Sequence, residues 1–145
     1  MKWCFLFLNL FFSILLFGQN DFQIKSADKE AKKISRELSA NQIQKIQIEN
    51  IYLTRFEQQN QIFADFNLSS SEKFLKNSAI YYASYAEINK ILDSTQKQKL
   101  SNIIVPQDVI LQQFLNSKEG QLLSKEEMFY VKMSWKYVLT PNNTQ

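Results

Sequence analysis

The 145-residue sequence contains no histidine, and its single cysteine is Cys4. Histidine is the commonest general base and a frequent metal ligand, so Ser-His and Cys-His nucleophile arrangements are excluded. With only two glycines in the chain, a glycine-rich phosphate loop is excluded as well. Among the carboxylates, Glu126 and Glu127 are adjacent and would point about 100° apart on a helix. We therefore predict that the protein is not an enzyme and has no catalytic residues, cofactor or metal.

The scarcity of turn-forming residues also bears on the fold. Glycine and proline number two each, whereas β-sandwiches and barrels need many such residues at their turns. Apolar residues make up 45% of the chain and aromatic residues 14%, which suffices for a packed core. The length fits one domain. We predict an all-α protein with a single helical domain over residues 19–140 and a disordered tail over residues 141–145.

The N-terminal segment has the layout of an export signal. Lys2 precedes an apolar run that carries no charge and ends at Phe17, and polar residues begin at Gln19. Crossing a bilayer takes about 20 residues, and a shorter run with polar residues behind it is typical of a signal peptide. Gly18 offers a small residue for cleavage. We predict a signal peptide over residues 1–18 and a periplasmic or secreted protein; an uncleaved anchor is the alternative, and the leader provides the only membrane contact.

Removal of the leader leaves a nearly neutral chain without cysteine. Losing Lys2 reduces the 17 Lys and Arg residues to 16, against 14 Asp and Glu, a net charge of +2. No disulfide can form, so stability must come from packing. Such a small imbalance argues against a dedicated nucleic-acid-binding protein.

The first predicted helix runs from Ser26 to Leu38 and carries two stripes. Its apolar face consists of Ala27, Ala31, Ile34 and Leu38. Its basic stripe consists of Lys29, Lys33 and Arg36. The basic stripe suits an anionic surface or an acidic partner, but a solvated helix face is the simpler interpretation.

A long antiparallel hairpin is expected to follow. The second helix, from Leu38 to Phe66, and the third, from about Ser70 to Leu92, are joined by a short connection, which makes neighbouring helices antiparallel. The third helix has a heptad seam like that of a coiled coil. Because the second helix has apolar residues on two faces, it could contact a second subunit in a homodimer. Shorter helices are predicted over Gln96–Ile104, from Pro106 to Gly120, and over Ser124–Leu139.

Aromatic residues recur at helical spacing on the two hairpin helices. They form a candidate surface for a client protein or for dimerisation, because tyrosine combines a large apolar face with a polar group. Core packing is the alternative interpretation of the same spacing. The residues are Tyr52, Phe56, Tyr81, Tyr82 and Tyr85.

One five-residue pattern occurs four times, with leucine first, Ser or Asp second and Gln or Glu fifth. It predicts a capping box, in which the second residue caps the helix and the fifth reaches back to the cap amide. The copies are Leu38-Ser39-x-x-Gln42, Leu68-Ser69-x-x-Glu72, Leu92-Asp93-x-x-Gln96 and Leu123-Ser124-x-x-Glu127.

Two of these copies carry a resemblance to a known family. LSANQ, followed by IQKIQIENI, and LDSTQ, preceded by YAEINKI and followed by KQKLSNII, resemble the paired LTxxQ motifs of the Spy/CpxP family. That family comprises small, exported, all-α envelope proteins whose motifs likewise lie at helix starts. The resemblance covers about residues 31–104, with Ser39 and Asp93 in place of threonine. The helices after Pro106 depart from the family pattern.

The resemblance implies an ATP-independent chaperone or envelope-stress adaptor. Such a protein would bind unfolded or partner proteins through a cradle-shaped helical dimer. The alternative is a secreted structural or interaction protein of the cell envelope without chaperone activity.

Overall fold

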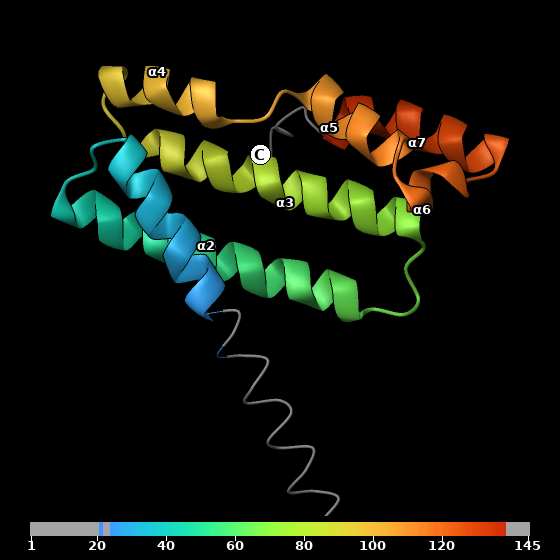
Figure 1. The fold of residues 1–145 in the computed structure, drawn as a ribbon, viewed down its shortest axis with the longest axis horizontal. Helices are drawn as coiled ribbons and strands as arrows, with labels where there is room; N and C mark the ends of the chain where they lie inside the picture. Colours follow the sequence, from blue (N-terminus) through green and yellow to red (C-terminus); the bar gives the residue numbers. More distant parts are fainter. Residues whose placement is uncertain (1–20, 22–23, 139–145) are drawn as a thin grey trace, which may run out of the picture.

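The structure is a computed structural model that describes residue 21 and residues 24–138. Within this part of the chain every regular element is a helix, which confirms the predicted all-α class. A helix over residues 24–37 comes first (Figure 1). The others are α2 (Gln42–Ala64), α3 (Ser70–Lys90), α4 (Ser94–Ile103), α5 (Gln107–Leu115), α6 (Lys118–Gln121) and α7 (Lys125–Val138). The predicted signal peptide and C-terminal tail lie outside the described residues.

The two longest helices, α2 and α3, lie side by side and run in opposite directions (Figure 1). The helix over residues 24–37 packs across the N-terminal half of α2, and α4 lies beside the C-terminal half of α3. No helix in the described residues is both long enough and apolar enough to traverse a bilayer.

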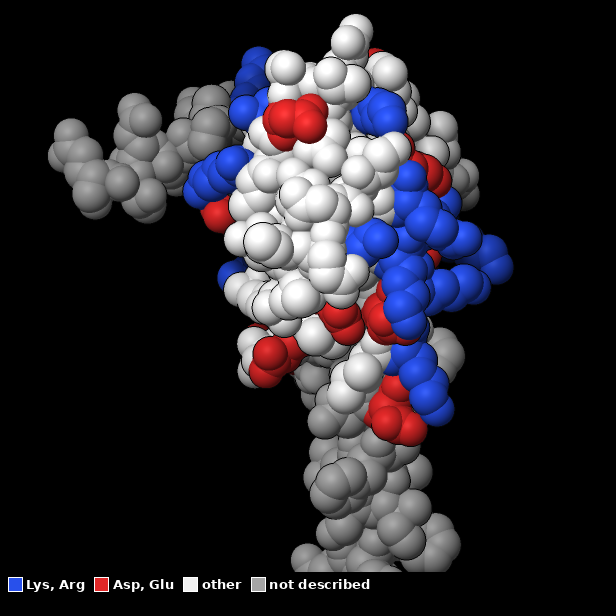
Figure 2. All heavy atoms as spheres, turned by 90° about the vertical axis from the view of Figure 1, so that its left-hand side faces the viewer, with Lys and Arg blue, Asp and Glu red and all other residues white. Residues whose placement is uncertain are grey.

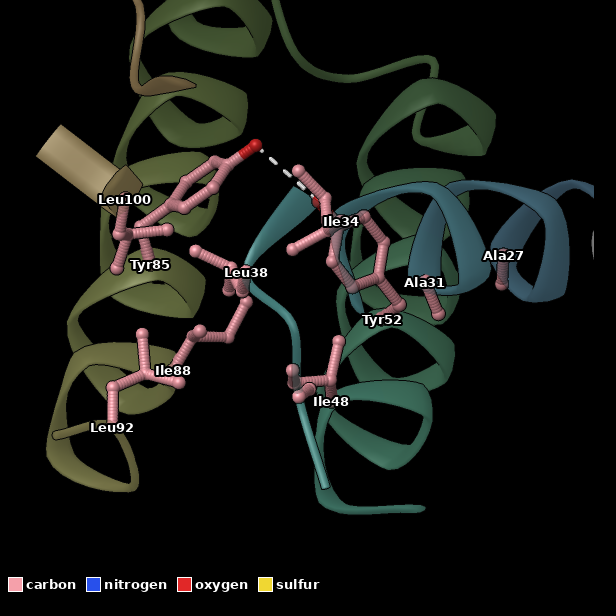
Figure 3. Packing of buried hydrophobic residues seen from close by; sticks show 11 residues of the cluster. Ala27, Ala31, Ile34, Leu38, Ile48, Tyr52, Tyr85, Ile88, Leu92 and Leu100 are labelled. Atoms are coloured by element: carbon pink, nitrogen blue, oxygen red, sulfur yellow. Dashed lines mark hydrogen bonds between the residues drawn. The ribbon is translucent and has the colours of Figure 1, made fainter. Parts of the chain in front are cut away.

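The main core forms where these four helices meet. Leu38 lies at its centre and points between α2 and α3 (Figure 3). The first helix contributes the apolar face that the sequence predicts, and all four residues of that face are buried. The core consists of Ala27, Ala31, Ile34, Leu38, Ala40, Ile48, Tyr52, Tyr85, Ile88, Leu92 and Leu100.

A second apolar cluster joins α3 to the C-terminal helices. The ring of Phe74 stacks on Phe114 at 3.9 Å between centroids and on Trp135 at 5.0 Å. Val131 of α7 is fully buried. Because the stacked rings come from α3, α5 and α7, they connect the C-terminal helices to the long hairpin pair.

The predicted helix from Pro106 to Gly120 is in fact two helices. Pro106 is the N-cap of α5, which ends at Leu115, and the Ser117 side chain accepts from the Gly120 amide at 3.1 Å to start α6. Gly120 therefore does not terminate α5. A Cβ atom on it would lie 2.0 Å from the Phe114 carbonyl oxygen, so the close turn between the two helices requires glycine.

Two of the predicted capping boxes lie at the starts of α3 and α7. The Ser69 amide donates to Glu72 at 2.8 Å, and the Ser124 amide donates to Glu127 at 2.9 Å. Each serine hydroxyl accepts from the amide of its glutamate in return. The backbone hydrogen bond from the serine lowers the pKa of Glu72 and of Glu127. Both predicted boxes are confirmed.

Candidate functional site: the paired helix starts and an aromatic groove

The turn between the first helix and α2 is a Schellman motif. The amide of Ala40 donates to the Ser35 carbonyl at 2.9 Å, and the amide of Ser39 donates to the Arg36 carbonyl at 3.0 Å. Ser39 has a φ of 55°, the left-handed conformation that this motif requires and that glycine usually provides. Ser39 therefore ends one helix and does not begin the next.

The N-cap of α2 is Asn41. Its side-chain oxygen accepts from the Gln44 amide at 2.9 Å, and the Gln44 side chain accepts from the Asn41 amide at 2.9 Å. The predicted box formed by Ser39 and Gln42 is wrong, because the Schellman turn uses Ser39 and Ala40 before α2 can start. The cap lies two residues further along the chain, within the same motif segment.

The predicted box at the start of α4 is confirmed. Asp93 accepts from the Gln96 amide at 2.8 Å, and the Gln96 side chain accepts from the Asp93 amide at 3.1 Å. Leu92, directly before the cap, is buried in the main core. The box is thus anchored to the core by the residue that precedes it.

The two capping glutamines, Gln44 and Gln96, bind each other, and we call them the glutamine pair. The Gln44 amide nitrogen donates to the Gln96 oxygen at 2.9 Å, and the Gln96 nitrogen donates to the Gln44 oxygen at 3.1 Å. Each nitrogen also donates to a backbone carbonyl, Gln44 to Ile91 at 2.9 Å and Gln96 to Ser39 at 3.4 Å. Ile91 and Ser39 occupy equivalent places, two residues before the respective N-cap.

Both side-chain amides are fully used in this arrangement. Each Gln nitrogen has two donors and each oxygen two lone pairs, and each group has two partners: its opposite glutamine and a backbone group. Gln96 is only 7% exposed. A buried polar network of this kind stabilises a unique arrangement when every member has its partners. The glutamine pair therefore fixes the start of α2 against the start of α4.

The glutamine pair marks an internal repeat with an offset of 52 residues. After each glutamine the sequence continues with lysine, a buried aliphatic residue, asparagine and isoleucine at the same spacing. Ile48 and Leu100 occupy the aliphatic position, and both are buried in the main core. The two copies are Gln44-Lys45-x-x-Ile48-x-Asn50-Ile51 and Gln96-Lys97-x-x-Leu100-x-Asn102-Ile103. This spacing is the sequence signal that points to Gln44 rather than Gln42.

Two of the five residues of the predicted aromatic surface are buried, and the other three are half-buried. Tyr52 and Tyr85 are buried, their hydroxyl oxygens lie 3.3 Å apart (Figure 3), and burial raises the pKa of Tyr52. Phe56 packs against the core. The core interpretation therefore holds for Tyr52 and Tyr85 and the client-surface interpretation is wrong for them, because the first helix packs over these residues.

Tyr81 and Tyr82 hold the segment between α4 and α5. The Val105 amide donates to the Tyr81 hydroxyl at 3.2 Å, and the Tyr82 hydroxyl donates to the Val105 carbonyl at 3.0 Å. Burial raises the pKa of the Tyr82 hydroxyl to about 12. The Arg55 guanidinium lies 4.7 Å from the Tyr81 ring centre, within the range of a cation–π contact.

An open groove of about 580 Å³ lies between α2, α3 and α5. We call it the aromatic groove. The Phe63 side chain at its edge is 62% exposed, and the Asn77 oxygen, buried beside it, accepts no hydrogen bond within the described structure. The apolar wall consists of Phe63, Phe74, Tyr81, Ile110 and Phe114. Such a groove fits apolar side chains of another molecule and leaves one acceptor for a polar contact.

Among the described residues, no three carboxylate or cysteine side chains lie close enough together to hold a metal ion. No family model, curated protein or solved structure matches the chain. The site must therefore be interpreted from its own geometry.

Proposed function

We propose that the protein is exported to the periplasm or secreted, and that it acts as an ATP-independent chaperone or envelope-stress adaptor of the Spy/CpxP type. In this proposal it binds unfolded or partner proteins through apolar contacts. It needs neither nucleotide nor cofactor for this activity.

The observation that carries the proposal is the glutamine pair. The family resemblance rests on Leu38-Ser39-x-x-Gln42 and Leu92-Asp93-x-x-Gln96. In the second motif Asp93 and Gln96 form the capping box, whereas the box beside the first motif is formed by Asn41 and Gln44, two residues further along than Ser39 and Gln42. Gln44 and Gln96 bind each other across the helix ends. If the two capping boxes had arisen by chance, their glutamines would not be expected to bind each other. Contact between them is expected if the two boxes belong to one scaffold.

The aromatic groove supplies a surface for clients. Phe63 lines it, and Phe66, in the turn after α2, is 95% exposed. Large exposed aromatic residues next to an apolar groove are typical of protein-binding surfaces. Because the contact is apolar and open, it suits clients of varied sequence.

A light-scattering assay without ATP tests the proposal. The chain from Gln19 is mixed with an aggregating client protein, and we expect it to suppress scattering. Replacing Phe63→Ser together with Phe66→Ser should weaken the suppression, because client side chains lose their apolar contact. Ile43→Ser is the control, because Ile43 is 71% exposed and lies outside the groove. An unchanged scattering curve at several-fold molar excess of wild-type protein would count against chaperone activity.

The alternative is a secreted structural or interaction protein of the envelope. Its distinguishing result is the recovery of one stoichiometric partner, with no effect on client aggregation. The same purified protein can be used for the aggregation assay and for the recovery of a partner.

A further inference from the structure

The outer face of the first helix is strongly basic. Residues on a helix are about 100° apart around the axis, so the cations of this helix fall within a sector about 100° wide. That sector lies opposite the buried face formed by Ala27, Ala31, Ile34 and Leu38. We call the cations the basic ridge, and all are exposed: Lys25, Lys29, Lys32, Lys33 and Arg36.

Figure 2 shows this arrangement on the molecular surface. Lys and Arg form a column along one edge of the face shown, following the first helix, while the centre of that face is mostly uncharged. The carboxylates of the helix flank the ridge, because Asp28, Glu30 and Glu37 lie about 90–110° from its midline.

Three cations of the ridge form no ion pair with another residue that the structure describes. Lys25 pairs with Asp21 at 3.3 Å, and Lys32 pairs with Asp28 at 2.7 Å. Within the described residues, Lys29, Lys33 and Arg36 make no salt bridge; Arg36 donates only to the Lys32 carbonyl, at 3.4 Å. The ridge therefore presents uncompensated positive charge to the solvent.

We propose that the basic ridge docks the protein on an anionic lipid surface. The charge of the ridge is complementary to such a surface, and its long side chains form a row without a fixed geometry. A row of this kind suits a uniformly charged surface better than a protein partner, which requires particular contacts at particular positions. This inference does not depend on client binding.

The position of the ridge in the chain favours the same partner. The apolar N-terminal run ends at Phe17, and the structure describes the first helix without a gap from residue 24 onwards. The intervening chain spans at most about 25 Å. Whenever that run lies in a membrane, the ridge is held within reach of the lipid headgroups.

The mode of docking follows from the buried face. Because the apolar side of the helix already packs against α2 and α3, it is not free to enter the bilayer. Docking must be electrostatic and peripheral, and it should be reversed by salt.

Vesicle co-sedimentation tests this proposal. The chain from Gln19 contains every residue that the structure describes and removes the leader as a membrane anchor. We expect it to sediment with phosphatidylglycerol vesicles at low salt, and neither with phosphatidylcholine vesicles nor at high salt. Each basic residue contributes about fivefold to partitioning, so Lys29→Gln, Lys33→Gln and Arg36→Gln together should lower it by roughly 100-fold.

A charge-matched variant provides the control. Lys76→Gln, Lys118→Gln and Lys132→Gln remove the same net charge from α3, α6 and α7, and should preserve most of the partitioning. Circular dichroism establishes that both variants remain helical. Equal losses in both variants, equal sedimentation with neutral vesicles, or charge-dependent binding to polyglutamate but not to vesicles would overturn the proposal; the last result would indicate an acidic protein partner.

Discussion

At the scale of single residues, the glutamine pair combines two roles that usually fall to different side chains. Gln44 and Gln96 each complete a capping box, and each also binds the other and a carbonyl of the opposite turn. A hydrogen bond contributes about 1 kcal/mol net, but a buried group left without its partner costs more. Loss of one glutamine therefore affects both helix starts.

Substitution of either glutamine by methionine preserves most of the side-chain volume and removes the amide. We expect Gln44→Met and Gln96→Met each to lower the free energy of unfolding by about 1–3 kcal/mol. The double variant should lose less than the sum, with a coupling of about 1 kcal/mol, because the second change removes an interaction already lost.

Urea unfolding followed by circular dichroism measures these values. Gln47→Met is the control, because Gln47 is exposed on the same helix. Strictly additive losses would mean that the two amides do not interact.

At the scale of elements, the turn between the first helix and α2 decides where the motif begins. In each half of the repeat a buried leucine, Leu38 or Leu92, follows the end of the preceding helix. The N-cap follows one residue after Leu92 but three residues after Leu38. The Schellman turn accommodates the two additional residues, and Ser39 adopts the left-handed conformation that this requires.

A matched pair of substitutions at Ser39 tests this account of the turn. A non-glycine residue in the left-handed region costs about 1 kcal/mol, so Ser39→Gly should raise the free energy of unfolding by about 0.5–1 kcal/mol. Ser39→Ala retains the backbone strain and loses only the hydroxyl that accepts from Lys99 at 3.0 Å. The alanine variant should therefore not raise the free energy of unfolding. Thermal unfolding distinguishes the two, and a stabilising alanine variant would contradict the account.

The same turn explains what sequence reasoning missed at this scale. The helices themselves follow from hydrophobic spacing, and the boxes at Ser69, Asp93 and Ser124 follow from local chemistry. The pattern Leu38-Ser39-x-x-Gln42 satisfies the same local rule, but the termination of the preceding helix already uses Ser39. A five-residue pattern carries no information about that competition.

The aromatic residues show a second limit. Their spacing identifies one helix face, but the face becomes core or surface according to which helix covers it. The first helix covers Tyr52, whereas nothing in the described residues covers Phe63 to the same extent. Sequence spacing alone cannot distinguish Tyr52 from Phe63, because both residues lie on the same face of α2.

At the scale of the whole molecule, the two ends of the hairpin pair have different tasks in our account. The glutamine pair and the main core hold the first helix, α2, α3 and α4 together at one end. The aromatic groove lies towards the other end, where it is lined by residues of α3, of α5 and of the C-terminal half of α2. The stacked rings of Phe74, Phe114 and Trp135 support that groove. The scaffold and the proposed client surface are thus separate.

The most direct test of the account is to map where a client contacts the protein. A photoreactive phenylalanine analogue is placed at Phe63, in the aromatic groove, and in a second variant at Ile43, which is exposed near the opposite end of α2. After irradiation with an unfolded client, and without ATP, we expect crosslinks from position 63 and few from position 43. Equal crosslinking at both positions, or crosslinking at position 43 alone, would contradict the assignment of the groove as the client site.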